Sequence, residues 1–213
     1  MYDAVLFDLD GTLVDTESVA VATGMAAFAA VGVTVELTFM LEMVGKDHAA
    51  TRAIIHQSHP GLDMDRLNAL WRQGFASSIA QELRVKPGVR ELLAGIALPM
   101  AVVTSSHRDE ARAKVAVSGL AQHFQLIISV DDVAHAKPAP DPFLLAAQKL
   151  GVDPARCLVF EDSDTGAEAA QRAGCKVVQV PDMQPTAGHF AHFLAPDILA
   201  GARMAGLLFA VPA

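Results

Sequence analysis

Short apolar runs rich in β-branched residues recur along the chain and alternate with segments that carry helix signals. The runs lie at residues 2–7, 100–104, 126–130, 157–160 and 176–180. The runs are mostly apolar, whereas a strand with one solvated face alternates apolar and polar positions. The pattern therefore predicts strands that are buried on both faces of a sheet.

The segments between the runs carry signals for helix starts and ends. Ser106, with Asp109 three positions later, resembles a capping box. Asp141 followed by Pro142 predicts an N-cap and a first-turn proline, and Gly151 predicts the end of that helix. Strand, helix and strand in repeated succession predict right-handed crossovers and a parallel α/β sheet.

Residues 15–83 break this rhythm, because they show helical patterns and no convincing strand. Helices are expected over residues 19–30, 37–58 and 63–81. Pro87 and Gly88 mark the return to the α/β pattern. The late stretch 193–210 predicts a final strand and helix against the core.

This organisation predicts two domains. Residues 1–14 and 84–213 would form a Rossmann-like parallel sheet core of the α/β class. Residues 15–83 would form a helical cap domain, inserted after the first strand and placed over the active edge of the sheet.

Composition and charge narrow the class of protein. The 213 residues are 52% hydrophobic and 19% charged, which predicts a globular chain with a sizeable aliphatic core. The net charge of −8 repels nucleic acid and anionic lipid, so neither is expected as a partner. Cys157 and Cys175 are too few for a disulfide framework, and we expect both to be buried in a reducing cytosol.

A cytoplasmic location follows from two further features. Residues 18–35 carry no charge, but they lack basic or aromatic interface anchors, so a buried helix is the better interpretation than a membrane span. The first residues show no cationic stretch ahead of an apolar core, as a secretory signal would. We expect a monomer, because a cap needs room to move.

The residues that follow the strands carry the candidate chemistry, since ligands of open α/β sheets bind outside the carboxyl ends of the strands. Asp8 and Asp10 follow the first strand, and two residues apart in an extended segment they face one volume. Glu161 and Asp162 follow the fourth strand. Such converging carboxylates need a cation, and ligands that are all oxygen favour Mg²⁺ over zinc.

A different set of groups is expected opposite this acidic cluster. The Thr104 hydroxyl, the backbone N–H groups around Ser105 and the Lys137 ammonium suit an anion. A metal, two carboxylates and an anion pocket together describe phosphoryl transfer. Asp8 would be the nucleophile, and Asp10 would act as general acid and base.

Four segments of the chain resemble the four motifs of the haloacid dehalogenase superfamily, in order and in spacing. These segments are residues 8–15 (DLDGTLVD), 104–106 (TSS), 137–141 (KPAPD) and 160–163 (FEDS). Residues 137–182 are similar to the β-phosphoglucomutase-like branch, whose members are mostly small sugar-phosphate phosphatases and mutases. The resemblance implies a Mg²⁺-dependent phosphatase that acts on small phosphorylated metabolites through an aspartyl-phosphate.

The resemblance also implies roles for single residues. Asp8 would be both nucleophile and metal ligand, and Asp10 would bind the metal through its backbone carbonyl. Asp162 would be a metal ligand, while Glu161 would bind directly or through water. Thr104 and Lys137 would contact the phosphoryl group. Dehalogenases of the superfamily need only one carboxylate and no metal, so the further carboxylates of this chain argue against dehalogenation.

Two other functions stay open. Mutases of this branch carry a histidine at the position of Ala20, so the alanine favours hydrolysis over a β-phosphoglucomutase-type phosphotransferase. A non-catalytic binding protein on the same scaffold is the other alternative. In the cap, Lys46, Trp71 and Arg72 would either reach a substrate or serve structural roles. Three histidines there are expected to be solvated, namely His48, His56 and His59.

Overall fold

The computed structural model describes residues 1–44 and 48–210, apart from the side chain of His48. The chain forms two compact units. The first unit combines Met1–Asp15 with the chain from Arg84 onward, and the second is Thr16–Leu83. No helix in the described part of the chain is long and apolar enough to cross a membrane.

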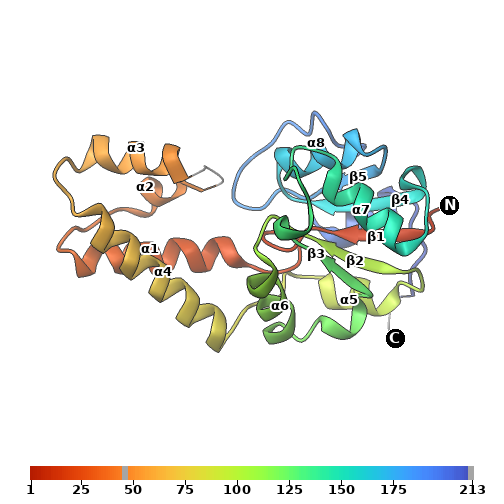
Figure 1. Ribbon diagram of the computed structural model, residues 1–213, viewed down its shortest axis with the longest axis horizontal. Coiled ribbons are helices and arrows are strands. Elements are labelled where there is room, and N and C mark those ends of the chain that lie inside the picture. Colours follow the sequence, from red (N-terminus) through yellow and green to blue (C-terminus); the bar gives the residue numbers. More distant parts are fainter. Residues whose placement is uncertain (45–47, 211–213) are drawn as a thin grey trace. The chain divides into compact units, whose positions relative to one another are not determined.

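The first unit is built on a six-stranded sheet in the order β3-β2-β1-β4-β5-β6 (Figure 1). Every neighbouring pair in it is parallel, which confirms the predicted α/β class with a Rossmann-like sheet. β1 lies between β2 and β4, so its carboxyl end meets both of theirs. The strands are β1 (Ala4–Phe7), β2 (Met100–Val103), β3 (Leu126–Ile128), β4 (Cys157–Glu161), β5 (Lys176–Gln179) and β6 (Phe193–Leu194).

Helices cover both faces of this sheet (Figure 1). Phe143 of α7 and Ala170 of α8 belong to one buried cluster with Leu6 and Val159 of the strands. On the opposite face Gly201 of α9 lies so close to the sheet that a Cβ there would fall 2.4 Å from Val178. The helices of this unit are α5 (Val89–Gly95), α6 (Arg108–Val117), α7 (Asp141–Leu150), α8 (Asp164–Arg172) and α9 (Ile198–Met204), with short 3₁₀ turns η1 (Ala121–His123), η2 (Val130–Asp132) and η3 (Pro154–Arg156).

The predicted helix caps are partly wrong. α6 begins at Arg108 and its N-cap is His107, so the capping box predicted at Ser106 does not form. α7 begins at Asp141 itself with Pro140 as N-cap, one residue before the predicted position. Gly151 ends α7 in the left-handed conformation with φ of 71°, as predicted. β6 and α9 confirm the predicted final strand and helix.

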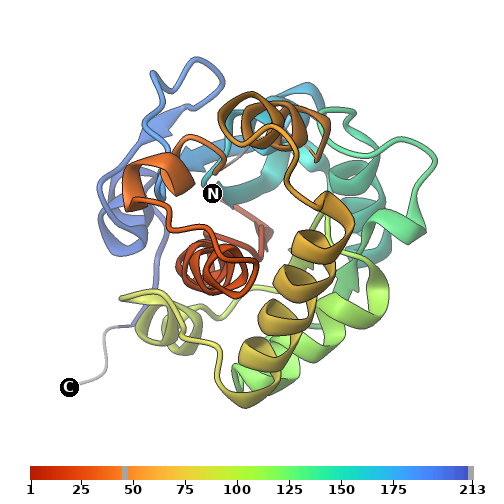
Figure 2. The same cartoon turned by 90° about the vertical axis from the view of Figure 1, so that its left-hand side faces the viewer.

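The second unit is all helical within its described residues. It contains α1 (Thr16–Ala30), α2 (Leu37–Leu41), α3 (His48–Ser58) and α4 (Met64–Gln81). α1 and α4 pack side by side (Figure 2), and the indole Nε1 of Trp71 donates to the carbonyl of Ala20 at 2.9 Å. The prediction of one helix over 37–58 is wrong, because α2 ends at Leu41 and α3 starts at His48.

The remaining candidates of this unit fall into different surroundings. The prediction that His59 is solvated is wrong. Its ring centroid lies 5.3 Å from that of Phe39 and 5.9 Å from that of Phe28. His56 is exposed, as expected. Arg72 is exposed, and its Nε donates to the carbonyl of Asn68 at 3.3 Å. Lys46 and the His48 side chain lie outside the described residues.

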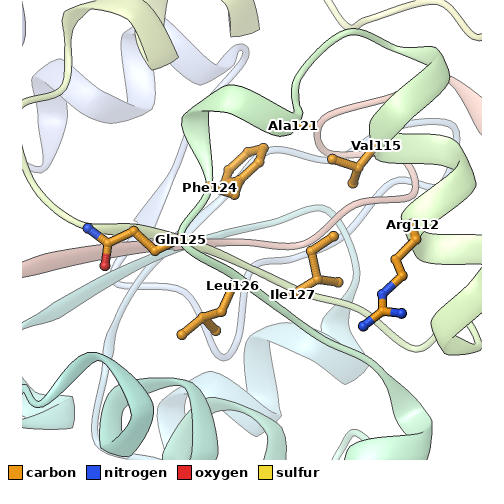
Figure 3. Close-up of a pocket in the computed structure, with 7 residues that line it drawn as sticks. All are labelled: Arg112, Val115, Ala121, Phe124, Gln125, Leu126 and Ile127. Carbon is orange, nitrogen blue, oxygen red and sulfur yellow. The ribbon is translucent and has the colours of Figure 1, made fainter.

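A small cavity of about 240 Å³ lies at the β3 edge of the sheet. Side chains of α6, η1 and β3 line it, with Val115 and Arg112 facing Ile127 (Figure 3). None of the predicted site residues lines it. The chemistry therefore has to be sought at the carboxyl ends of the strands.

We expect the central strand to carry much of the stability of the first unit. Leu6 is fully buried in β1, whereas Leu208 is 86% exposed. Leu6→Ala should lower the free energy of unfolding by about 2–5 kcal/mol, because it removes apolar contacts and leaves a cavity. The matched change Leu208→Ala should cost less than about 0.5 kcal/mol. Urea unfolding followed by circular dichroism measures both, and equal losses would contradict this account of the core.

Candidate active site

Asp8 and Asp10 follow β1 at the centre of the sheet, in a tightly packed turn. The Asp8 side chain is 10% exposed, and the backbone N–H of Asp8 donates to the carbonyl of Phe160 in β4 at 2.9 Å. Gly11 has φ of 88°, and a Cβ at this position would lie 2.3 Å from Oδ2 of Asp162. Only glycine fits there, and its small size brings the Asp162 carboxylate close to the turn.

Three carboxylates form a group that could hold a metal ion. One oxygen each from Asp8, Glu161 and Asp162 lies within 4.8 Å of the others. Glu161 is fully buried at the end of β4, and Asp162 follows it. The donors are all oxygen, which suits Mg²⁺, and the bare Gly11 backbone leaves their approach unobstructed. The Asp10 carboxylate is not part of this group.

Lys137 lies inside the acidic cluster and not opposite it, which corrects the prediction from sequence. Its Nζ donates to Oδ1 of Asp8 at 2.7 Å, to Oε1 of Glu161 at 2.5 Å and to the carbonyl of Val103 at 2.8 Å. The Lys137 side chain is only 4% exposed. This ammonium therefore binds the two most deeply buried carboxylates together.

The pKa values of this group reflect burial and charge acting against each other. Burial raises the pKa of Asp8 to about 8, with Glu161 and Asp10 adding to the rise and Lys137 opposing it. Burial alone would lower the pKa of Lys137, but Asp8 and Glu161 together outweigh it and raise that pKa. A divalent cation beside Asp8 would favour its charged form, which is the form a nucleophile needs.

The carboxylate of Asp10 turns away from Asp8 toward the end of β2 and the start of α6. Its Oδ2 accepts from the hydroxyls of Ser106 at 2.7 Å and Thr104 at 3.5 Å. Its Oδ1 accepts from the ammonium of Lys114 at 2.7 Å. Thr104 is thus brought into the site as predicted, while Ser105 is exposed and makes no hydrogen bond to the other predicted residues within the described chain.

Sequence reasoning missed Lys114 and the side chain of Ser106. A signal for Lys114 was present, because it stands three residues after Ala111 and beside Val115, on the buried stripe of α6. A lysine on such a stripe needs a partner of opposite charge inside the fold. For Ser106 the capping-box pattern predicted the wrong partner for its hydroxyl.

Residues at the start of α8 contact the Glu161 carboxylate of the acidic cluster. The hydroxyl of Ser163 caps the helix by accepting from the N–H of Gly166 at 3.1 Å, and it donates to Oε2 of Glu161 at 3.1 Å. Gly166 leaves room for that carboxylate, since a Cβ there would lie 1.8 Å from Oε1. Gln179 of β5 donates to the carbonyl of Asp162 at 3.3 Å. Ser163 and Gly166 thus hold the Glu161 carboxylate in place.

A second set of contacts links η2 to the start of α6 through the carboxylate of Asp132. The carboxylate of Asp132 accepts from the hydroxyl of Ser129 at 2.6 Å and from its N–H at 2.8 Å. It also pairs with the guanidinium of Arg108 at 2.7 Å. Burial acts to raise the pKa of Asp132, but Ser129 and Arg108 outweigh it and lower that pKa to about 2.

The fold and this group of side chains belong to one class of enzymes. The family of haloacid dehalogenase-like hydrolases matches residues 5–180, and the chain belongs to that family. The resemblance seen in the four sequence motifs is thereby confirmed.

Similar proteins narrow the class further. Fructose-1-phosphate phosphatase YqaB of Escherichia coli is 34% identical over 181 residues, which are 84% of this chain and 96% of that protein. A solved family hydrolase from Deinococcus radiodurans, with bound phosphate and sodium, has a TM-score of 0.84 and 28% identity over 97% of both chains. CbbY from Rhodobacter sphaeroides, in complex with xylulose-1,5-bisphosphate, has a TM-score of 0.70 and 27% identity, covering 92% of this chain and 95% of that one. The Escherichia coli relative and validoxylamine A 7'-phosphate phosphatase of Streptomyces hygroscopicus are both named as phosphatases, in agreement with the predicted enzyme class.

The close contact at Gly166 predicts an unusual sensitivity to one methyl group. Gly166→Ala should lower the free energy of unfolding by about 1–3 kcal/mol, because the Glu161 carboxylate held by Lys137 has to move. Gly74 of α4 is the matched control, since a Cβ there would make an ordinary 3.5 Å contact with Thr23. Gly74→Ala should stabilise by about 0.5–1 kcal/mol through helix propensity. Thermal unfolding measures the stability of both variants, and a Gly166→Ala variant more stable than wild type would contradict the close contact.

The lowered pKa of Asp132 predicts a pH-dependent contribution to stability. Its folded pKa of about 2 lies below the ordinary 3.8, so the contribution is complete above pH 3.8 and is lost as the pH falls toward 2. Asp132→Asn should therefore cost about 2 kcal/mol at pH 6. The difference from wild type should shrink below pH 4. Urea unfolding at pH 6 and pH 3 tests this, and a difference independent of pH would contradict it.

Proposed function

We propose that this protein is a Mg²⁺-dependent phosphatase of small phosphorylated metabolites, with sugar phosphates as the substrate class. The observation that carries the proposal is the group formed by Asp8, Lys137 and Glu161, whose side chains are buried, together with the half-buried Asp162. Asp10 stands two positions after Asp8 in the same turn. The named activity of the Escherichia coli relative and the sugar bisphosphate bound by CbbY support the substrate class.

Mg²⁺ would be held by the carboxylates of Asp8, Glu161 and Asp162, with the backbone carbonyl of Asp10 as a further ligand. When bound, the ion supplies positive charge that stabilises the charge on the transferred phosphoryl group. Residues of this chain carry out the bond formation and the proton transfers.

In the first step an oxygen of Asp8 forms a bond to phosphorus while the bond from phosphorus to the ester oxygen breaks. Asp10 donates a proton to that leaving oxygen, and the alcohol departs. In the second step Asp10 takes a proton from water, whose oxygen bonds to phosphorus and frees Asp8. Thr104, Lys137 and the backbone N–H groups around Ser105 would donate to the phosphoryl oxygens.

The helical unit Thr16–Leu83 is proposed as the cap domain that selects the substrate and excludes water from the intermediate. Hydrolysis is proposed over transfer between sugar positions, since Ala20 stands where mutases of the related branch carry a histidine. The net charge of −8 supports a small-molecule substrate over nucleic acid or a membrane surface. The monomeric state and the cytoplasmic location stay predictions.

The first test is phosphate release from a panel of sugar phosphates, nucleotides and p-nitrophenyl phosphate. Asp8→Asn should reduce release by more than about a thousandfold, because the nucleophile is lost. Asp153→Asn is a matched control on an exposed aspartate whose capping role an asparagine retains, and it should leave release unchanged. If wild type releases no phosphate, or Asp8→Asn keeps its activity, hydrolysis through Asp8 is overturned.

The metal has a readout of its own. Mg²⁺ should raise the melting temperature of wild type, because a ligand that binds the folded state stabilises it. Asp162→Asn should reduce that rise, and a chelator should abolish phosphate release. A melting temperature insensitive to Mg²⁺, together with release that survives the chelator, would refute the metal site.

A further inference from the structure

A second buried lysine, Lys114, binds Asp10 and Ser106. The ammonium of Lys114 lies 2.7 Å from Oδ1 of Asp10 and 2.9 Å from the hydroxyl of Ser106. That hydroxyl in turn lies 2.7 Å from Oδ2 of the same carboxylate. Lys114, Ser106 and Asp10 therefore form a closed triangle of hydrogen bonds that fixes both carboxylate oxygens.

The triangle is anchored in rigid elements. Lys114 stands in the last turn of α6 and its side chain is 8% exposed, whereas the Asp10 side chain is 30% exposed. The ammonium is thus the buried member of the pair, and the carboxylate faces the open part of the site. Ser106 lies three residues after the end of β2, and its N–H donates to Thr104 Oγ1 at 3.0 Å.

A gain in stability is a poor explanation for this pair. Burying an ammonium costs desolvation energy, and a buried ion pair is often no more stabilising than apolar side chains of the same size. What the pair does provide is a fixed direction for a carboxylate that would otherwise rotate freely. The nearby Lys137 does not provide it, because its ammonium contacts Asp8, Glu161 and the carbonyl of Val103.

We propose that Lys114 is a positioning residue for Asp10, and this inference rests on the proposed function. Together with Ser106 it holds the Asp10 carboxyl group where a proton can pass to the leaving oxygen. Lys137 binds Asp8 and Glu161, whereas Lys114 donates to the Asp10 carboxylate and to the Ser106 hydroxyl. The loss of Lys114 should therefore harm the proton transfer to the leaving group more than it harms substrate binding.

The leaving group distinguishes this role from a merely structural one. An alkoxide leaving from a sugar phosphate needs a proton, whereas p-nitrophenolate leaves without one. Since kcat/KM reports the steps up to departure of the leaving group, Lys114→Met should lower it about 10- to 100-fold for the sugar phosphate turned over best, and less than about threefold for p-nitrophenyl phosphate. The sugar-phosphate loss should fall on kcat with little change in KM.

Three further variants make the test specific. Lys114→Arg keeps a cation and should recover part of the lost activity. Ser106→Ala removes one donor to Oδ2 and should show the same selectivity with a smaller loss, even if Lys114→Met folds poorly. Lys149→Met changes an exposed lysine of α7 and should leave kcat/KM unchanged for both substrates. Thermal unfolding of each variant reports folding separately.

The outcomes separate the two proposals. A selective loss on the sugar phosphate, partly rescued by arginine, supports positioning by Lys114. Equal losses on both substrates, or no loss on either, would overturn it while the phosphatase stands. Wild type that releases phosphate from neither substrate would overturn the proposed function and this inference with it.

Discussion

The crowding of negative charge at one edge of a parallel sheet is the constraint on which the site depends. Because all strands end at this edge, carboxylates from β1 and β4 meet there, and two of them are buried. Two lysines divide this charge between them. Lys137 binds Asp8 and Glu161, and Lys114 binds Asp10, so the two aspartates that follow β1 have separate counterions and separate directions.

The sequence predicted the sheet well, for a clear physical reason. Strands buried on both faces are continuously apolar, and helices between them require parallel pairing, so the core needed no knowledge of distant contacts. The helix starts were less predictable. Ser106 carries a pattern typical of a cap, but its hydroxyl has a stronger partner in the Asp10 carboxylate, a residue far away in the sequence. A local pattern cannot weigh such a competitor.

The same limit explains what was and was not predicted of the site. The topology alone brings Asp8, Asp10, Thr104, Glu161 and Asp162 to one edge, and the sequence motifs pointed to it. Which oxygen faces which ammonium depends on the depth of each side chain, and this placed Lys137 among the carboxylates and not across from them. Lys114 showed itself only through its place on the buried stripe of α6.

The insertion of the helical unit after β1 has a consequence for how the protein folds during its synthesis. β1 leaves the ribosome before its partners β2 and β4, which follow only after the whole of Thr16–Leu83 has been synthesised. Until then the apolar strand has no neighbouring strand, while α1 and α4 of the insert can already pack on each other. Cotranslational folding should thus begin in the helical insert, and the catalytic edge should be completed last.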